Sequence, residues 1–231
     1  MADDLFSRRT LSGLELAGAD IGKLAAGSSP VHLIDCVLDE AELGKLDFTG
    51  WVFERCSLRR ADLAAAILEG TRWQSCRGAF ATFAGADLTE AAFASCDFNN
   101  AVFRRSNLTS ASFRGCKLTG DDLSDIRGVD ASFEETLLIG AKLAGHSFRG
   151  QVLRKLDLAQ ADLRNCDFRD ALFEDCSLRE ANMAGSRFAG ADLRAADISG
   201  LRLGDAALFR GATISRDQAG QLLGELGLDV R

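Results

Sequence analysis

The chain has 231 residues, of which 47% are hydrophobic and 26% charged, and its formal net charge is −7. These proportions are typical of one folded, solvated domain, and no apolar run is long enough to cross a membrane. Two histidines and no tyrosine leave few groups for acid–base chemistry. We therefore expect a cytoplasmic protein with reduced thiols that is not an enzyme.

A repeat begins near the N-terminus, where large apolar residues recur at every fifth position. A helix face recurs at three or four residues and a half-buried strand at two, so this period is typical of neither. We expect a first coil over about 4–24 and a phase shift over about 22–32, where two residues are inserted around Pro30, the only proline. The apolar residues of the first coil are Phe6, Leu11, Leu16 and Ile21.

The same period continues through a main column over residues 31–210. Every fifth residue from Leu33 to Leu208 is large and apolar, except Gly78 and Gly128, which are compatible with bulged or widened turns. The residue two positions earlier is mostly Ala, Cys, Ser or Thr. This pairing predicts an all-β solenoid, in which four five-residue segments close one square coil and both residues face the axis.

Residues that are 20 apart should then lie above one another at the spacing of neighbouring strands, about 4.8 Å. Aromatic side chains with this spacing predict a core stack of Phe53, Trp73, Phe93, Phe113, Phe133 and Phe173. All seven cysteines occupy small inward positions without C-x-x-C spacing, so we expect no metal site. Stacked coils lie within disulfide range, but parallel side chains are poorly aimed for that bond. We therefore expect buried thiols that pack as small hydrophobes.

The repeat unit can be read directly in the sequence. It appears as "ADL" at 61, 86, 161 and 191, as "SNL" at 106 and as "ANM" at 181. This unit resembles the A-(D/N)-L-x-x pattern of the pentapeptide-repeat family, and the resemblance covers nearly the whole chain. It implies a right-handed quadrilateral parallel β-helix of about ten coils. A fold does not by itself carry a function.

Three inward positions that should be small hold polar residues, namely Asp121, His146 and Gln151. Buried polar groups need partners, so we interpret these positions as structural irregularities where turns bulge or open, with a functional surface as the alternative. A filled core column leaves no cavity of the size that small-molecule sites need. We therefore expect no cofactor and no small-molecule substrate.

The repeat ends in a different pattern, "GATISRDQAGQLLGELGLDVR", over residues 211–231. Ser215 and Gln218 have the spacing of a capping box, and Gly227 is placed to end a helix. An open solenoid end must be covered, so this segment is predicted to be a capping and dimerisation helix, with a monomeric lid as the alternative. The expected dimer interface consists of Ala219, Leu222, Leu223, Leu226 and Leu228.

A repeat column that ends in a short helix with "QLLGELGLDV" resembles the quinolone-resistance (Qnr-type and MfpA-type) branch of the family. That resemblance implies a homodimer that binds DNA gyrase or topoisomerase IV, imitates duplex DNA in part and protects the enzyme from quinolone-like or natural-product poisons. The column from 33 to 208 lacks the out-of-phase loops of the Qnr type. The alternative is a rod-shaped scaffold for another cytoplasmic partner, and direct nucleic-acid binding is not expected.

Charge limits how far the chain can imitate DNA. Duplex DNA carries one negative charge per about 1.7 Å, so a coil rising about 4.8 Å would need roughly three negative charges. A net charge of −7 spread over all coils is too small to imitate DNA over the whole surface. One acidic face is therefore the candidate for partial imitation. The freer acidic residues on the face over Phe48 and Leu68 are Glu69, Glu90, Asp130 and Asp170. Asp47, Asp87 and Asp167 on the same face have the alternative role of hydrogen-bonding within turns.

Overall fold

The computed structural model describes residues 9–27, 29–201, 207–225 and 227–229. By its internal contacts the chain divides into two compact units. The N-terminal unit comprises residues 1–117 and 126–132, and the C-terminal unit comprises residues 118–125 and 133–231. Both are built from stacked five-residue segments.

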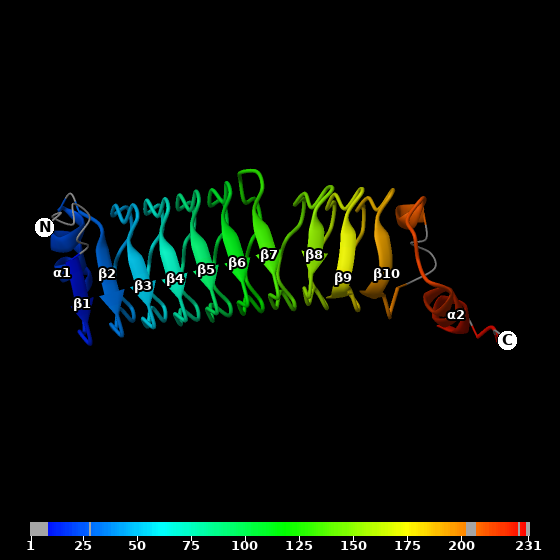
Figure 1. Ribbon diagram of the computed structural model, residues 1–231, viewed down its shortest axis with the longest axis horizontal. Coiled ribbons are helices and arrows are strands. Elements are labelled where there is room, and N and C mark those ends of the chain that lie inside the picture. The colour runs from blue at the N-terminus through cyan, green and yellow to red at the C-terminus, as the bar shows by residue number, and fades with distance from the viewer. Residues whose placement is uncertain (1–8, 28, 202–206, 226, 230–231) are drawn as a thin grey trace, which may run out of the picture. The chain divides into compact units, whose positions relative to one another are not determined.

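The strands of the N-terminal unit pair in parallel and in chain order (Figure 1). From β2 onward each strand residue lies opposite the residue that follows four five-residue segments later, as Leu33 opposite Phe53 and Phe53 opposite Trp73. One coil therefore takes four such segments, as the repeat predicts. The elements are β1 (Arg9–Ser12), α1 (Gly18–Ala25), β2 (Val31–Ile34), β3 (Val52–Glu54), β4 (Arg72–Gln74), β5 (Ala92–Ala94) and β6 (Ser112–Arg114).

The first coil differs from the others. Leu11 of β1 lies opposite Leu33 of β2, whereas four regular segments would have placed it opposite Val31. The difference agrees with the two inserted residues expected there. This longer coil contains α1, a helix that the five-residue period did not predict. Its Ile21 is completely buried, and α1 lies beside β1 at the N-terminal end of the unit (Figure 1). Phe6 lies outside the described residues.

The C-terminal unit continues the pattern with parallel strands and ends in a helix (Figure 1). Leu153 lies opposite Phe173, which is again four segments later. The predicted fold class, a parallel β-solenoid with a short C-terminal helix, is confirmed. The elements are β7 (Ser132–Glu134), whose last two residues belong to this unit, β8 (Val152–Arg154), β9 (Leu172–Ser177), β10 (Asp192–Asp197) and α2 (Arg216–Glu225).

Two sets of backbone interactions define each coil. The N–H of an inward apolar residue donates to a carbonyl of the next coil, as from Leu63 to Thr82 at 2.8 Å. At the corners, almost every fifth residue has a positive φ, for example Glu90 at 57° and Gly70 at 61°. Left-handed φ costs an ordinary residue about 1 kcal/mol or more. The regular hydrogen bonds between coils offset that cost.

Aromatic rings stack along the axis of the N-terminal unit. Ring centroids are 3.9 Å apart between Phe53 and Trp73, 5.5 Å between Trp73 and Phe93, and 4.6 Å between Phe93 and Phe113. The indole N–H of Trp73 donates to Thr71 at 2.9 Å, so the buried ring keeps a hydrogen-bond partner. In the C-terminal unit Phe133 and Phe173 are also buried. There the stacked rings belong to another face: Phe148, Phe168, Phe188 and Phe209.

All seven cysteines are buried free thiols, as expected for core residues. The thiol of Cys76 donates to the carbonyl of Phe53, in the preceding coil, at 3.2 Å. Cys166 and Cys176 make the equivalent bonds to Leu143 and Leu153, also at 3.2 Å. Burial raises the pKa of the Cys166 thiol to about 12, so this group stays protonated and acts as a small donor in the core.

The repeat loses its register before residue 208, where the sequence predicted an unbroken column. In the regular coils, the backbone N–H of an inward apolar residue donates to the carbonyl of the residue just before its stacked partner. The N–H of Leu63, for example, donates to the carbonyl of Thr82, and Phe83 stacks on Leu63. By the same rule the N–H of Phe188 would donate to the carbonyl of Ala207, but it donates to the carbonyl of Leu208. The ring that stacks on Phe188 therefore belongs to Phe209, with centroids 4.5 Å apart. One residue has been added to this coil. Leu203 lies outside the described residues.

The two glycines of the apolar column have different explanations. Gly78 makes the regular bond to Asp97, and a Cβ built on it would lie 2.1 Å from the Phe98 ring, which fills the vacant space. Its coil is not bulged. Gly128 is exposed with φ of +107°, next to Val129, whose exposed fraction is 66%. Gly128 thus marks an irregular turn.

Gly78→Ala should destabilise the protein by about 1–3 kcal/mol, because the added methyl group must displace a fully buried ring. The matched control is Gly22→Ala in α1, where nothing lies within 4 Å of the added atom. That change should be neutral or stabilising by up to about 1 kcal/mol, since alanine favours a helix. Urea unfolding of both variants provides the measurement. Equal effects would contradict the role assigned to Phe98.

Candidate interaction surfaces

One face of the N-terminal unit is rich in acidic side chains. It comprises the outward residues beside Phe48, Leu68, Leu88, Leu108 and Gly128, and we call these residues the acidic segment. Glu69, Glu90 and Asp130 are exposed here, and Arg127 is the one basic residue among these positions. The structure therefore brings three of the four predicted acidic residues onto one face of one unit. The acids of the segment are Asp47, Glu69, Asp87, Glu90 and Asp130.

Two of these acids form hydrogen bonds within turns, as their position in the repeat suggested. Asp47 accepts the backbone N–H and the hydroxyl of Thr49 at 2.9 and 2.7 Å. Asp87 does the same with Thr89 at 3.1 and 2.6 Å and also accepts from Asn107 at 3.1 Å. The hydrogen bonds to Thr49 lower the pKa of Asp47. These carboxylates stabilise corners, which leaves Glu69, Glu90 and Asp130 available to a partner.

The corresponding positions of the C-terminal unit have a different charge. Asp170, the fourth predicted acidic residue, is exposed and lies 3.6 Å from the guanidinium of Arg149. Asp167 accepts two hydrogen bonds from Arg169, at 2.9 and 2.7 Å, and one from Arg187 at 2.9 Å. The paired Arg169 is the main cause that lowers the pKa of Asp167 to about 2. The carboxylates of these positions are thus neutralised by arginines.

A shallow groove of about 450 Å³ follows these arginines and is lined by Arg169, Arg187 and Arg210. Its exposed apolar surface comes from Ala189, Ala207 and Leu208, and the ring of Phe188 beneath them is completely buried. We call it the arginine groove. No sequence motif marks these arginines as a group. Their grouping depends on the stacking of coils and on the shifted register after Phe188.

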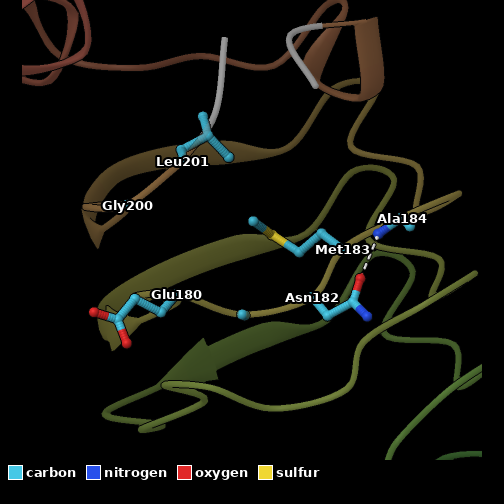
Figure 2. Close-up of a pocket in the computed structure, with 7 residues that line it drawn as sticks. Glu180, Asn182, Met183, Ala184, Gly200 and Leu201 are labelled. Atoms are coloured by element: carbon cyan, nitrogen blue, oxygen red, sulfur yellow. Dashed lines mark hydrogen bonds between the residues drawn. The ribbon is translucent and has the colours of Figure 1, made fainter. Parts of the chain in front are cut away.

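A second hollow of the C-terminal unit, of about 370 Å³, lies over the segment 180–184. Figure 2 shows Met183 and Leu201 on its apolar side, and Asn182 accepting the backbone N–H of Ala184 at 3.3 Å. The carboxylate of Glu180 accepts a hydrogen bond from Gln160 at 2.9 Å. One carboxylate and one amide do not form the nucleophile–base arrangement that hydrolytic sites use. The hollow supports no catalytic assignment.

The three polar residues at inward positions do not open the coils, contrary to the expectation from sequence. The backbone N–H groups of Asp121, His146 and Gln151 make the usual corner bonds, at 3.3, 3.0 and 3.1 Å. Asp121 is completely buried and Gln151 half-buried. The ring of His146 packs edge-on against Phe148 with centroids 4.5 Å apart, and its Nε2 is buried without a hydrogen-bond partner. Burial lowers the pKa of His146 to about 4.

The side chain of Gln218 connects the C-terminal helix α2 to the last coil. Ser215 and Gln218 form the predicted capping box, with bonds of 2.7 and 3.1 Å. The amide of Gln218 also donates to the carbonyls of Leu193 and Ala196 of β10, both at 2.7 Å. Gln218 thus covers part of the open sheet edge, a second role that the sequence motif did not reveal.

One exposed leucine lies on α2 and a second lies just after the helix. Gly227 has φ of +79° and ends the helix, with backbone bonds from Gly227 to Gly224 and from Leu228 to Leu223, as in a Schellman motif. The exposed fractions of Leu223 and Leu228 are 37% and 54%. Ala219 and Leu222 are half-buried, and Leu226 lies outside the described residues.

Comparison with known proteins establishes the family. The pentapeptide-repeats family matches residues 56–93, 86–125, 131–170 and 171–211, with eight copies of its unit. These matches cover more than half of the chain, so the protein belongs to the pentapeptide-repeat family. No curated protein matches it in sequence. Among the described residues, no helix is long and apolar enough to span a membrane, and no cluster of three or more His, Cys, Asp or Glu is arranged to hold a metal.

Solved structures of similar fold include the plasmid-mediated fluoroquinolone resistance protein QnrB1. A trypsin-treated variant of QnrB1 has a TM-score of 0.71 at 23% identity, covering 87% of this chain and 98% of QnrB1. Full-length QnrB1 has a TM-score of 0.62 at 22% identity, covering 95% and 100%. HetL, from the cyanobacterium Nostoc, matches at 25% identity with a TM-score of 0.38, covering 83% and 88%. The likeness to QnrB1 shows a shared fold.

His146 should make the protein sensitive to mild acid. Its pKa is about 4 in the folded state and about 6.5 in the unfolded state, so the unfolded state binds the proton first. Stability should fall as the pH drops from 6.5 toward 4, by about 2 kcal/mol at pH 5. In His146→Ala this loss should disappear, measured as the difference between urea unfolding at pH 7 and at pH 5.

The matched control is His32→Gln, because His32 is partly exposed and contacts Glu54 at 3.1 Å. That variant should keep the acid sensitivity of the parent chain. If His146→Ala retained the full loss between pH 7 and pH 5, another group would have to be responsible.

Proposed function

We propose that this protein binds a type II topoisomerase, DNA gyrase or topoisomerase IV, and protects it from quinolone-like or natural-product poisons. It acts as a cytoplasmic, non-enzymatic homodimer that imitates duplex DNA in part. The observation that carries the proposal is the acidic segment of the N-terminal unit, because it is an ordered row of negative charge on a solenoid face. The fold that the chain shares with a fluoroquinolone resistance protein supports the same function.

The charge of the acidic segment is enough for a limited contact. Five acids and one arginine leave four net negative charges over the five coils between Asp47 and Asp130. Duplex DNA would present roughly three charges over each coil. The segment can therefore occupy part of a DNA-binding surface, and shape must supply the rest of the recognition. Glu69, Glu90 and Asp130 are the residues proposed to contact the enzyme.

The double change Glu90→Lys and Asp130→Lys should weaken gyrase binding about tenfold or more, because it reverses two charges at the proposed contact. Both residues have left-handed φ, which Lys45 and Lys155 also adopt, so lysine fits these corners. The measurement is gyrase supercoiling and poison-induced DNA cleavage, with and without a quinolone, at increasing protein concentration.

The control carries Glu15→Lys and Glu42→Lys, two exposed acids outside the acidic segment. It has the same change in net charge and should protect like the parent chain. If the parent chain altered neither cleavage nor supercoiling and did not bind gyrase, the proposal would fail. The protein would then be a scaffold for another partner.

Dimerisation is proposed to use the exposed Leu223 of α2 and Leu228, which follows the helix. The double change Leu223→Asp and Leu228→Asp places charges on that surface and should yield the 24.7 kDa monomer in light scattering. Gln221→Asp, exposed on the same helix, should leave the dimer intact. A parent chain that is already monomeric would contradict the dimer and favour a lid.

A further inference from the structure

The arginine groove of the C-terminal unit is not used by the function proposed above. Arg169 and Arg187 come from successive coils, and Arg210 comes from the segment that stacks on Phe188. Phe188, Ala189, Ala207 and Leu208 supply the apolar part of the lining. The groove thus combines guanidinium groups with an apolar floor.

Asp167 holds two of these arginines in place. Arg169 donates to it through Nε and Nη2, and Arg187 through Nη2. The side chain of Asp167 is 11% exposed, whereas those of Arg169 and Arg187 are 33% and 58% exposed. A molecule in the groove therefore meets the guanidinium groups, and the carboxylate lies beneath them. Because both heads are already oriented, less conformational entropy is lost when an anion binds.

The groove carries a net positive charge at close range. Arg149, Arg169, Arg187 and Arg210 face Asp167 and Asp170, which leaves two positive charges at these positions. Guanidinium groups bind carboxylates and phosphates through paired, charge-assisted hydrogen bonds. An anionic group is the chemistry that these donors fit.

We propose that the arginine groove binds an acidic segment of a partner protein, one that carries an apolar side chain beside its carboxylates. The carboxylates bond to Arg187 and Arg210, and the apolar side chain packs on Ala189, Ala207 and Leu208. A nucleic-acid backbone fits less well, because the chain has a net charge of −7, which repels a polyanion at long range. The exposed aliphatic surface of Ala189, Ala207 and Leu208 also favours an apolar residue.

The test uses the full chain and a fluorescein-labelled peptide of repeating Glu-Leu-Glu-Phe units, measured by fluorescence anisotropy. The double variant Arg187→Glu and Arg210→Glu should bind the peptide about tenfold more weakly, and Arg187→Gln with Arg210→Gln should give a smaller loss in the same direction. The control Arg179→Glu with Arg216→Glu, exposed residues outside the groove lining, should bind like the parent chain. Circular dichroism melting identifies variants that fail to fold.

Related probes test the chemistry. Replacing each Glu of the peptide by Gln, or each Leu and Phe by Ser, should weaken binding. Equal binding by the parent and the Arg187→Gln, Arg210→Gln variant would overturn the proposal. The proposal would also fail if a single-stranded oligonucleotide or inorganic phosphate competed more strongly than unlabelled peptide. It would fail as well if the peptide did not bind and the chain self-associated through these arginines. Gyrase protection is a separate readout, so failure of one proposal leaves the other standing.

Discussion

The structure depends on the parallel hydrogen-bond ladder that joins each coil to the next. A bond such as that from Leu63 to Thr82 forms only if the intervening coil has the right length. The same spacing brings Phe53 under Trp73 and the thiol of Cys76 to the carbonyl of Phe53. An added residue would shift all of these contacts together, which explains why extra residues occur near the ends, before β2 and after Phe188.

Periodicity was sufficient to predict the core, because the large and small inward columns have no other consistent arrangement. It could not distinguish α1, since Ile21 satisfies the five-residue period and is also the buried residue of a helix. The second role of Gln218 depends on carbonyls of β10, which no local motif specifies. The left-handed corners had a sequence signal, because several glycines share the corner position of the five-residue repeat, as Gly70 and Gly85 do.

The candidate surfaces were less predictable than the core, because the repeat constrains inward positions and leaves outward ones free. Sequence reasoning placed Glu90 and Asp170 on one face. The local environments of the two differ, since Asp170 lies beside Arg149 whereas Glu90 belongs to the acidic segment. A count of charged residues along a face does not show which acids are paired with a neighbouring arginine. The physical quantity that matters to a partner is the charge left after each local pair has formed.

Turn formation decides which charges remain. An aspartate at the second position of the repeat accepts the N–H two residues later, as Asp47 and Asp167 do, and this stabilises the left-handed corner that follows. Where the residue two positions later is a threonine, as Thr49 is after Asp47, the carboxylate keeps its charge near the surface. Where that residue is an arginine, as Arg169 is after Asp167, the guanidinium covers the carboxylate and becomes the exposed group. A single arginine beside a corner therefore neutralises the local negative charge, and a second arginine from the next coil, as Arg187 beside Asp167, makes it positive. The hydrogen-bond ladder and the core stay the same, so one solenoid can present acidic and basic surfaces.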